Sequence, residues 1–214
     1  MEKKKSLAES VSQREEFKRK FSLWELYRSF VFAPRAVSKL IGNKKSQLVD
    51  KHFIERLQLA VTEVNGCAAC SWQHTQMALE QGMSNEEISS FLSGGDSFIK
   101  TEEAKAIMFA QHFADSKGYP KKSAYESIVK EYGEKEARII LSAAQMMIAG
   151  NMYGIPFSAF VSRLNGKSYK GSSLFYELGM LIVGILCLPI AITHGFLRAL
   201  IGLKNVRFDK SEAE

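Results

Sequence analysis

Apolar side chains recur at helical spacing along almost the whole sequence, and no segment shows the strict alternation of a half-buried strand. The clearest run follows Asp50, where Phe53, Leu57 and Val64 lie on one face of a helix. Asp50 is a suitable N-cap for this helix, and Gly66 can end it because glycine readily adopts the left-handed conformation. The sequence therefore predicts an all-α fold, a bundle of helices.

The other expected helices are separated by glycines, prolines and capping residues. They are a charged arm over residues 1–20, a helix over 21–41 that breaks at Pro34, one from Cys67 to Gly82, a short one capped by Ser84 and Glu87, one over 101–116, one over 123–132, and a long one from Glu134 that is disturbed at 154–156. We therefore divide the chain into an N-terminal helical arm (1–44), a core (45–166) and an apolar C-terminal extension (167–214).

The extension contains an uninterrupted run from Leu178 to Leu197 without a charged residue. Twenty such residues reach the length of a membrane-spanning helix, but Pro189 lies in the middle of the run. Two interpretations stay open: a buried helical hairpin or oligomer contact bent at Pro189, and contact with a membrane. We expect residues 174–203 to pack onto the core or a neighbouring subunit, with basic residues on both sides suited to a membrane surface.

Composition narrows the class of protein. The 214 residues are 46% apolar and 24% charged, which is enough for a hydrophobic core without disulfide staples. The net charge of +6 is concentrated near the chain ends, and no basic stripe interleaved with aromatic residues is present, so we expect no nucleic-acid partner. Residues 1–20 are charged and lack the apolar region of a secretory signal. We therefore expect a cytoplasmic protein, with membrane association left open.

The chemistry is concentrated in the segment Cys67-Ala-Ala-Cys70-Ser-Trp-Gln-His74. On a helix these three side chains share one face within mutual reach. Cys67 falls at the helix start, where the helix dipole favours a thiolate and where we expect the sulfur to be exposed to a reductant. Cys70 lies one turn deeper, beside His74, which can accept its proton. In a reducing compartment, a close cysteine pair is more often catalytic or metal-binding than structural.

Two other interpretations of this segment stay open. Cysteine is often only a small buried apolar residue, as we expect for Cys187 in the extension. Alternatively, Cys67, Cys70 and His74 with one carboxylate could bind zinc, although no second Cys/His cluster accompanies them. Redox chemistry by the two thiols is the interpretation that we favour, and it requires no cofactor and no metal.

The pattern Glu55, then Cys67-x-x-Cys70 and His74, resembles the alkylhydroperoxidase D-like group of the carboxymuconolactone decarboxylase superfamily. Gly82 followed by Ser-Asn-Glu-Glu-Ile is similar to the continuation in that group, and the resemblance covers about residues 45–165. It implies an all-α bundle that assembles into a homo-oligomer, a trimer or a trimer-based hexamer. It also implies reduction of hydroperoxides, with a protein thiol or lipoyl-type dithiol as the reductant.

By the same resemblance, Cys70 is the peroxide-reactive thiol, Cys67 resolves it, and His74 and Glu55 form a proton relay. The chain departs from the best-known peroxidases at Ala69, where those have a histidine, which implies weaker turnover or a different substrate. Without the resemblance Glu55 would be read as a surface residue, and Glu63 is the nearer carboxylate in sequence.

Three function classes follow from these observations. The first is a thiol-dependent peroxidase or disulfide reductase. The second is a redox-sensing or binding protein in which the dithiol forms a disulfide without turnover. The third is a lactone decarboxylase-like enzyme, against which the cysteine pair argues, because that branch of the superfamily lacks it. The peroxide, the physiological reductant and the number of subunits stay open.

Overall fold

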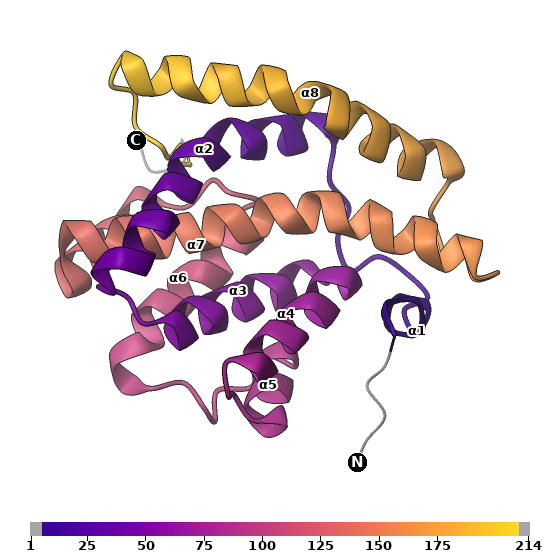
Figure 1. Cartoon of the computed structure of the whole chain (residues 1–214), viewed down its shortest axis with the longest axis horizontal. Helices are drawn as coiled ribbons and strands as arrows, with labels where there is room; N and C mark the ends of the chain where they lie inside the picture. The colour runs from indigo at the N-terminus through magenta and orange to yellow at the C-terminus, as the bar shows by residue number, and fades with distance from the viewer. Residues whose placement is uncertain (1–5, 210–214) are drawn as a thin grey trace.

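The computed structural model describes residues 6–209, and over these residues it is all-α, as the apolar spacing predicts. The helices are α1 (Leu7–Ser12), α2 (Leu23–Ser46), α3 (Lys51–Asn65), α4 (Ala68–Glu80), α5 (Asn85–Leu92), the 3₁₀ helix η1 (Thr101–Glu103), α6 (Ala104–Asp115), α7 (Lys122–Leu164) and α8 (Leu174–Leu200). Helix α7 crosses the middle of the molecule, with α2 and α8 above it in Figure 1 and α3 to α5 below it. The core lies where α3, α6 and α7 meet.

Local capping places several helix ends where the sequence predicts them. Asp50 accepts hydrogen bonds from the backbone N–H groups of His52 and Phe53 at the start of α3. Gly66 ends that helix with a left-handed φ of 73°. Ser84 accepts a hydrogen bond from the Glu87 N–H and so caps α5. These ends depend on neighbouring residues only, which explains why a sequence pattern predicts them.

The predicted breaks at proline are wrong. Pro34 lies inside the continuous helix α2, and Pro156 lies inside α7. The interruption in α7 is at Gly133, whose φ of 75° and ψ of 162° separate two helices there, as the predicted ends at 132 and 134 require. A proline removes one helical hydrogen bond. The packing of α2 and α7 against each other and against α8 offsets that loss. The predicted disturbance at residues 154–156 is absent for this reason.

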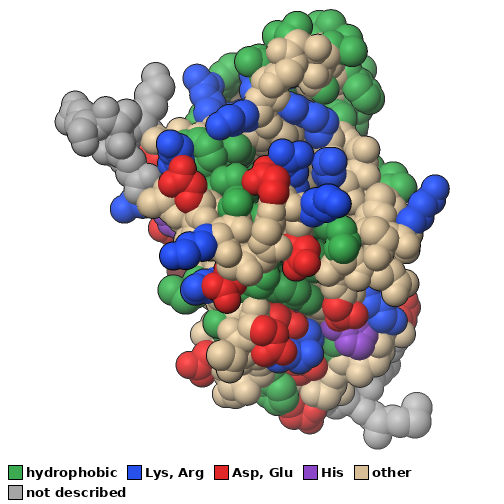
Figure 2. Space-filling model, turned by 90° about the vertical axis from the view of Figure 1, so that its left-hand side faces the viewer, with side chains coloured by type: hydrophobic (Ala, Val, Ile, Leu, Met, Phe, Trp, Pro, Cys, Tyr) green, Lys and Arg blue, Asp and Glu red, His purple; other side chains and the backbone are tan. Residues whose placement is uncertain are grey.

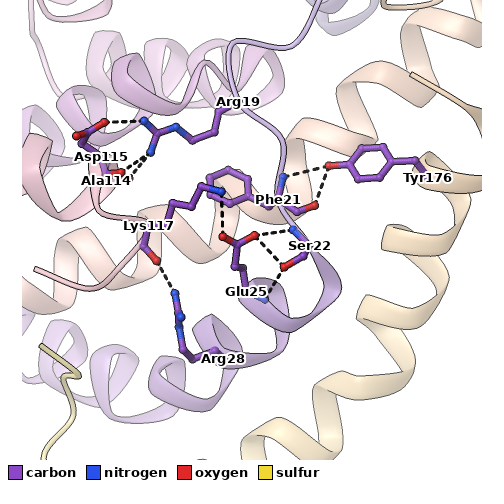
Figure 3. Close-up of polar contacts among 9 residues, drawn as sticks. All are labelled: Arg19, Phe21, Ser22, Glu25, Arg28, Ala114, Asp115, Lys117 and Tyr176. Carbon is purple, nitrogen blue, oxygen red and sulfur yellow. Dashed lines mark hydrogen bonds and ion pairs between the residues drawn. The ribbon is translucent and has the colours of Figure 1, made fainter. Parts of the chain in front are cut away.

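The charged helix predicted over residues 1–20 is also mostly wrong within residues 6–20. Only Leu7–Ser12 is helical, and residues 1–5 lie outside the described part of the chain. The segment that follows runs in extended form between α6 and α8 (Figure 3). Arg19 donates to the Ala114 carbonyl and to Asp115 at the end of α6. These hydrogen bonds from the Arg19 side chain hold the segment against the end of α6.

The start of α2 is bonded both to α8 and to the turn that follows α6 (Figure 3). The backbone of Phe21 exchanges hydrogen bonds with the Tyr176 hydroxyl on α8. Ser22 and Glu25 form a capping box, and Glu25 also pairs with Lys117 at 3.1 Å. Helices α2, α6 and α8 are therefore joined at one point.

The apolar extension forms one helix, α8, so the predicted hairpin bent at Pro189 is wrong. Pro189 is accommodated inside the helix, and α8 lies along α2 on the outside of the molecule (Figure 1). Figure 2 views the molecule from the left-hand side of Figure 1 and shows hydrophobic side chains gathered at the top, over the end of α8. The extension is thus neither buried nor separate from the body.

Candidate active site

Cys67 and Cys70 are joined by a disulfide at the start of α4, with their Cα atoms 5.2 Å apart. Cys67 is the N-cap residue, and its Sγ accepts a hydrogen bond from the Cys70 backbone N–H at 3.2 Å. A sulfur in this position lies among the unpaired N–H groups of a helix N-terminus, which stabilise a negative charge. The sulfur of Cys67 therefore faces the positive end of the α4 dipole.

The expectation that Cys67 is exposed to a reductant is wrong. Its exposed fraction is 0%, because the N-terminal segment covers the turn that precedes it. A side chain added at Gly66 would meet Lys18 at 2.5 Å and Arg14 at 2.9 Å. Of the two sulfurs, it is that of Cys70 that borders a cavity. Solutes in the cavity therefore meet the pair at Cys70.

Glu55 and His74 form a buried pair beside the disulfide. The Glu55 Oε1 and the His74 Nδ1 are 2.6 Å apart, and the two residues are 2% and 9% exposed. Glu55 lies on α3 and His74 on α4, so the pair crosses the interface between the two helices. A carboxylate on Nδ1 fixes the ring tautomer with its proton on that nitrogen, which leaves Nε2 as the basic atom.

A cavity of about 770 Å³ borders both Cys70 and His74. Its walls are largely apolar; most come from α2, α4, α7 and α8, with Leu7 from α1 and Gln58 from α3. Phe30 contributes from α2, Tyr153 and Phe157 from α7, and Ala69 from α4. The apolar lining suits an apolar molecule that carries one reactive polar group.

Helix α7 approaches the disulfide closely through a glycine. A Cβ added at Gly154 would lie 2.7 Å from both sulfur atoms, which is closer than any carbon can stand. One turn later, the Ser158 hydroxyl accepts a hydrogen bond from the Ala69 N–H at 3.0 Å and donates one to the Gly154 carbonyl at 2.7 Å. Gly154 and Ser158 thus hold the start of α4 against α7.

A second polar contact fixes the end of α3 just before the dithiol. Asn65 donates to Asn151 on α7 at 2.9 Å, and Asn151 donates to Thr62 at 3.3 Å. All three residues are fully buried. Sequence reasoning missed Asn151, Gly154 and Ser158. These residues are three and four positions apart, so they share one face of a helix, and this spacing could have identified them. We interpreted Gly154-Ile155-Pro156 as a helix disturbance instead.

The other candidates of the sequence lie away from the dithiol or have other partners. Glu63 forms an ion pair with Lys18 on the surface rather than with His74. His52 lies 2.9 Å from the Gln81 carbonyl, and His112 accepts a hydrogen bond from the backbone of Lys121. Cys187 is a half-buried free cysteine on α8. Residues 6–209 contain no group of three or more His, Cys, Asp or Glu side chains placed to hold a metal ion.

Residues 34–111 match the family model of the carboxymuconolactone decarboxylase family. Comparisons with curated proteins and with solved structures found no match. The matched range contains Glu55, Cys67, Cys70 and His74, whereas α8 and all of α7 lie outside it. Residues 34–111, and with them all four residues of the site, are thus similar to the carboxymuconolactone decarboxylase family.

Proposed function

We propose that this chain is a thiol-dependent peroxidase, or disulfide reductase, that reduces hydroperoxides with the Cys67–Cys70 pair. One observation carries the proposal: Cys70 and His74 border the same cavity, while Cys67 is bonded to Cys70 and Glu55 is hydrogen-bonded to His74. A reactive thiol, a base, an orienting carboxylate and a resolving thiol are therefore adjacent. The similarity of residues 34–111 to the carboxymuconolactone decarboxylase family, which includes enzymes, supports this proposal.

In the first step, His74 takes the thiol proton of Cys70, and the thiolate attacks the outer oxygen of a hydroperoxide. The O–O bond breaks, the alkoxide leaves as the alcohol with the proton that His74 returns, and Cys70 becomes a sulfenic acid. Glu55 stabilises the imidazolium that forms between these two proton transfers. Peroxide is reduced by two electrons, and the sulfur of Cys70 is oxidised by two.

In the second step, the Cys67 thiolate attacks the Cys70 sulfur. The S–S bond forms, the S–O bond breaks, and hydroxide leaves with a proton as water. The position of Cys67 at the N-terminus of α4 favours the thiolate that this step needs. An external dithiol, a protein thiol or a lipoyl-type dithiol, then reduces the disulfide, and it reaches the pair at Cys70. We also propose that the protein acts in the cytoplasm as a homo-oligomer, a trimer or hexamer.

The test follows thiol loss and peroxide consumption together in the reduced protein, with dihydrolipoamide as the dithiol. Wild type should consume peroxide continuously and form the Cys67–Cys70 disulfide. Cys67→Ser should stall as a sulfenic or over-oxidised acid at Cys70, and Cys70→Ser should consume no peroxide. Cys187→Ser is the matched control, because this cysteine is distant in sequence and free, and it should behave as wild type.

Two results would contradict the proposal. If wild type consumes one equivalent of peroxide and dihydrolipoamide cannot restore it, the pair is a redox sensor without turnover. If Cys70→Ser reacts as fast as wild type, the assigned thiol is wrong. His74→Ala adds a separate readout, since its rate should fall most near neutral pH and recover at alkaline pH, where a free thiol ionises without a base.

A further inference from the structure

Helix α8 presents a long apolar face that no other part of the described chain covers. The helix has 27 residues with a mean hydropathy of 2.2 in its most apolar window, and only 28% of that window is buried. Large apolar side chains on this face are more than half exposed, among them Phe175, Ile182, Leu186, Ile190 and Leu200. A surface of this size on a soluble protein marks an interaction site.

The opposite face of α8 is packed along its length onto the body. Gly184 and Gly195 approach α2 so closely that a Cβ on Gly195 would lie 2.3 Å from the Val31 carbonyl oxygen. Ala191, between them, is fully buried. Because the helix is held from its side, it cannot cross a bilayer alone without carrying α2 with it. The geometry suits a helix that lies in the plane of a membrane interface, with the protein body in place of a polar helix face.

Aromatic residues with polar atoms stand beside this apolar face. Trp24 is 61% exposed and stacks on Tyr27 with ring centroids 5.7 Å apart. The Tyr27 hydroxyl in turn lies 3.1 Å from the Nδ1 of His194 on α8. Tryptophan and tyrosine are enriched at the boundary between acyl chains and headgroups, because one end of each ring is apolar and the other is polar.

Below the end of α8, the guanidinium groups of Arg35 and Arg198 lie near each other. Figure 2 shows lysine and arginine side chains directly beneath the hydrophobic top of the molecule. Arg35 and Arg198 donate to the backbone carbonyls of Leu203 and Lys204, and within residues 6–209 neither is paired with a carboxylate in a salt bridge. The Nε and Nη2 of Arg35 and the Nε of Arg198 are buried without a hydrogen-bond partner. Burial, and then the charge of Arg198, lower the pKa of Arg35. Two neighbouring positive charges at this end of α8 favour an anionic surface beside it.

The charges also discriminate between a membrane and a second copy of this chain. The only acidic residue of α8 is Glu177, which is fully buried and bonded to Arg163. A second copy that packed α8 against α8 across a two-fold axis would bring the same cations toward each other, so the subunit contacts of the proposed trimer or hexamer would use other faces. An anionic lipid surface supplies the opposite charge along with apolar chains for the exposed face.

The cavity at the dithiol has a wall from this same helix. Gly184, Ile185 and Leu188 of α8 line it together with Cys70 and His74. Ile185 is 61% exposed and Leu188 37%, so both side chains reach from the cavity to the outer surface. An acyl chain in a membrane under α8 would therefore be adjacent to the reactive sulfur.

From these contacts we infer that α8 lies in the headgroup boundary of an anionic membrane, and that the site takes acyl-chain hydroperoxides from that membrane. The substrate half of this inference rests on the proposed peroxidase function. The lipid hydroperoxide is reduced to the lipid alcohol, and its outer oxygen leaves as water when Cys67 and Cys70 close their disulfide. The external dithiol named above supplies the two electrons.

Binding is tested by flotation of the full chain with vesicles of phosphatidylcholine alone and with added phosphatidylglycerol. Wild type should float with the anionic vesicles, and salt should weaken this binding. The double variant Leu186→Glu/Ile190→Glu changes two exposed residues outside the cavity lining and should bind about tenfold less or worse. Met108→Glu is the matched control, because Met108 is 67% exposed on α6 and should float as wild type does.

Light scattering of the same proteins measures the number of subunits, and so tests whether a second copy of this chain covers α8 instead. If wild type ignores both kinds of vesicle, or if the double variant loses subunits while its vesicle binding is unchanged, the face is a contact between copies and the inference is overturned. Circular dichroism confirms that the variants are folded, which surface positions should allow.

Substrate choice is tested by the rate of disulfide formation in the reduced protein. Phosphatidylcholine hydroperoxide in anionic vesicles should react at least tenfold more slowly with the double variant than with wild type. Hydrogen peroxide should oxidise both proteins at the same rate. Equal rates with the lipid hydroperoxide would overturn the substrate assignment. If neither peroxide forms the disulfide in wild type, the proposed peroxidase function fails, and flotation still decides the membrane contact independently.

Discussion

The dithiol site and the α2–α8 contact both depend on glycines that let two helices approach closely, but they differ in what lies behind each helix. At Gly154, α7 meets a disulfide that is itself enclosed by α3, α4 and the N-terminal segment. At Gly195, α8 meets the backbone of α2, and its outer side is uncovered within residues 6–209. The two sulfur atoms that face Gly154 are fixed by their disulfide, whereas the outer helix α8 can move away. Close packing at Gly154 therefore determines the geometry of the cysteine pair, whereas close packing at Gly195 determines only where α8 lies on α2.

The largest effect is expected for Gly154→Ala. The added methyl group would overlap both sulfur atoms, so α4 and α7 must separate. Overpacking of this kind costs about 3 kcal/mol of unfolding free energy, and the displaced cysteines should form their disulfide slowly or not at all. Chemical denaturation and thiol titration measure the two effects.

Gly150→Ala is the control for that prediction, because it lies on the same helix and an added Cβ meets only the end of Met147 at an ordinary 3.8 Å. It should be neutral or slightly stabilising, since alanine is the better helix former. Equal stability of the two variants would show that α7 does not press on the disulfide.

Glu55→Gln should have the next largest effect. The substitution keeps the shape of the side chain but replaces a buried charged hydrogen bond to His74 with a neutral one. We expect a loss of about 2 kcal/mol and slower oxidation of Cys70 by peroxide. The matched control is Glu63→Gln, whose surface pair with Lys18 is worth about 0.5 kcal/mol. If Glu55→Gln and Glu63→Gln are oxidised by peroxide at the same rate, Glu55 takes no part in the proton relay.

A smaller effect is expected at the second glycine. Gly195→Ala would push α8 away from Val31, but the uncovered outer side lets the helix move, so we expect a loss of about 1 kcal/mol. Oxidation by hydrogen peroxide should be unchanged. Gly179→Ala, on the same helix with nothing within 4 Å of the added Cβ, serves as control. A Gly195→Ala variant that loses its disulfide chemistry would show that the two regions are coupled more tightly than their packing indicates.

The smallest effect concerns Glu25, which lies where the two regions are joined. Burial would raise the pKa of this carboxyl, but hydrogen bonds from Ser22 and the ammonium of Lys117 lower it below its ordinary value of 4.5. Its stabilising contribution is therefore complete above that value and is lost as the pH falls through the lower pKa of the folded state.

Glu25→Gln should remove this pH dependence and cost about 0.5 to 1 kcal/mol at neutral pH, as expected for a weakened helix cap. Thermal unfolding of both proteins between neutral and acidic pH measures the difference. Melting temperatures that stay parallel down to low pH would contradict the assignment of Glu25 to this cap.

Several features could be predicted from the sequence because they depend on neighbouring residues. The ends of α3 and α5 follow from Asp50, Gly66 and Ser84, whose side chains or backbone act within one turn. The common face of Cys70 and His74 follows from their four-residue spacing. By contrast, nothing near Pro34 indicates that α2 continues through it, because the compensating contacts come from α7 and α8.

By itself, the sequence determined an all-α chain, a cysteine pair within reach of a histidine, and a long run that water solvates poorly. The resemblance pointed to Glu55 as the partner of His74, and the structure places the two side chains in contact. Tertiary structure alone decided that Cys67 is fully buried, that Cys70 borders the cavity, and that α8 supplies one wall of it. The physical reason is the range of the interactions. Capping and helical spacing act over a few residues, whereas burial of a charge and access to a sulfur depend on helices that are distant in sequence.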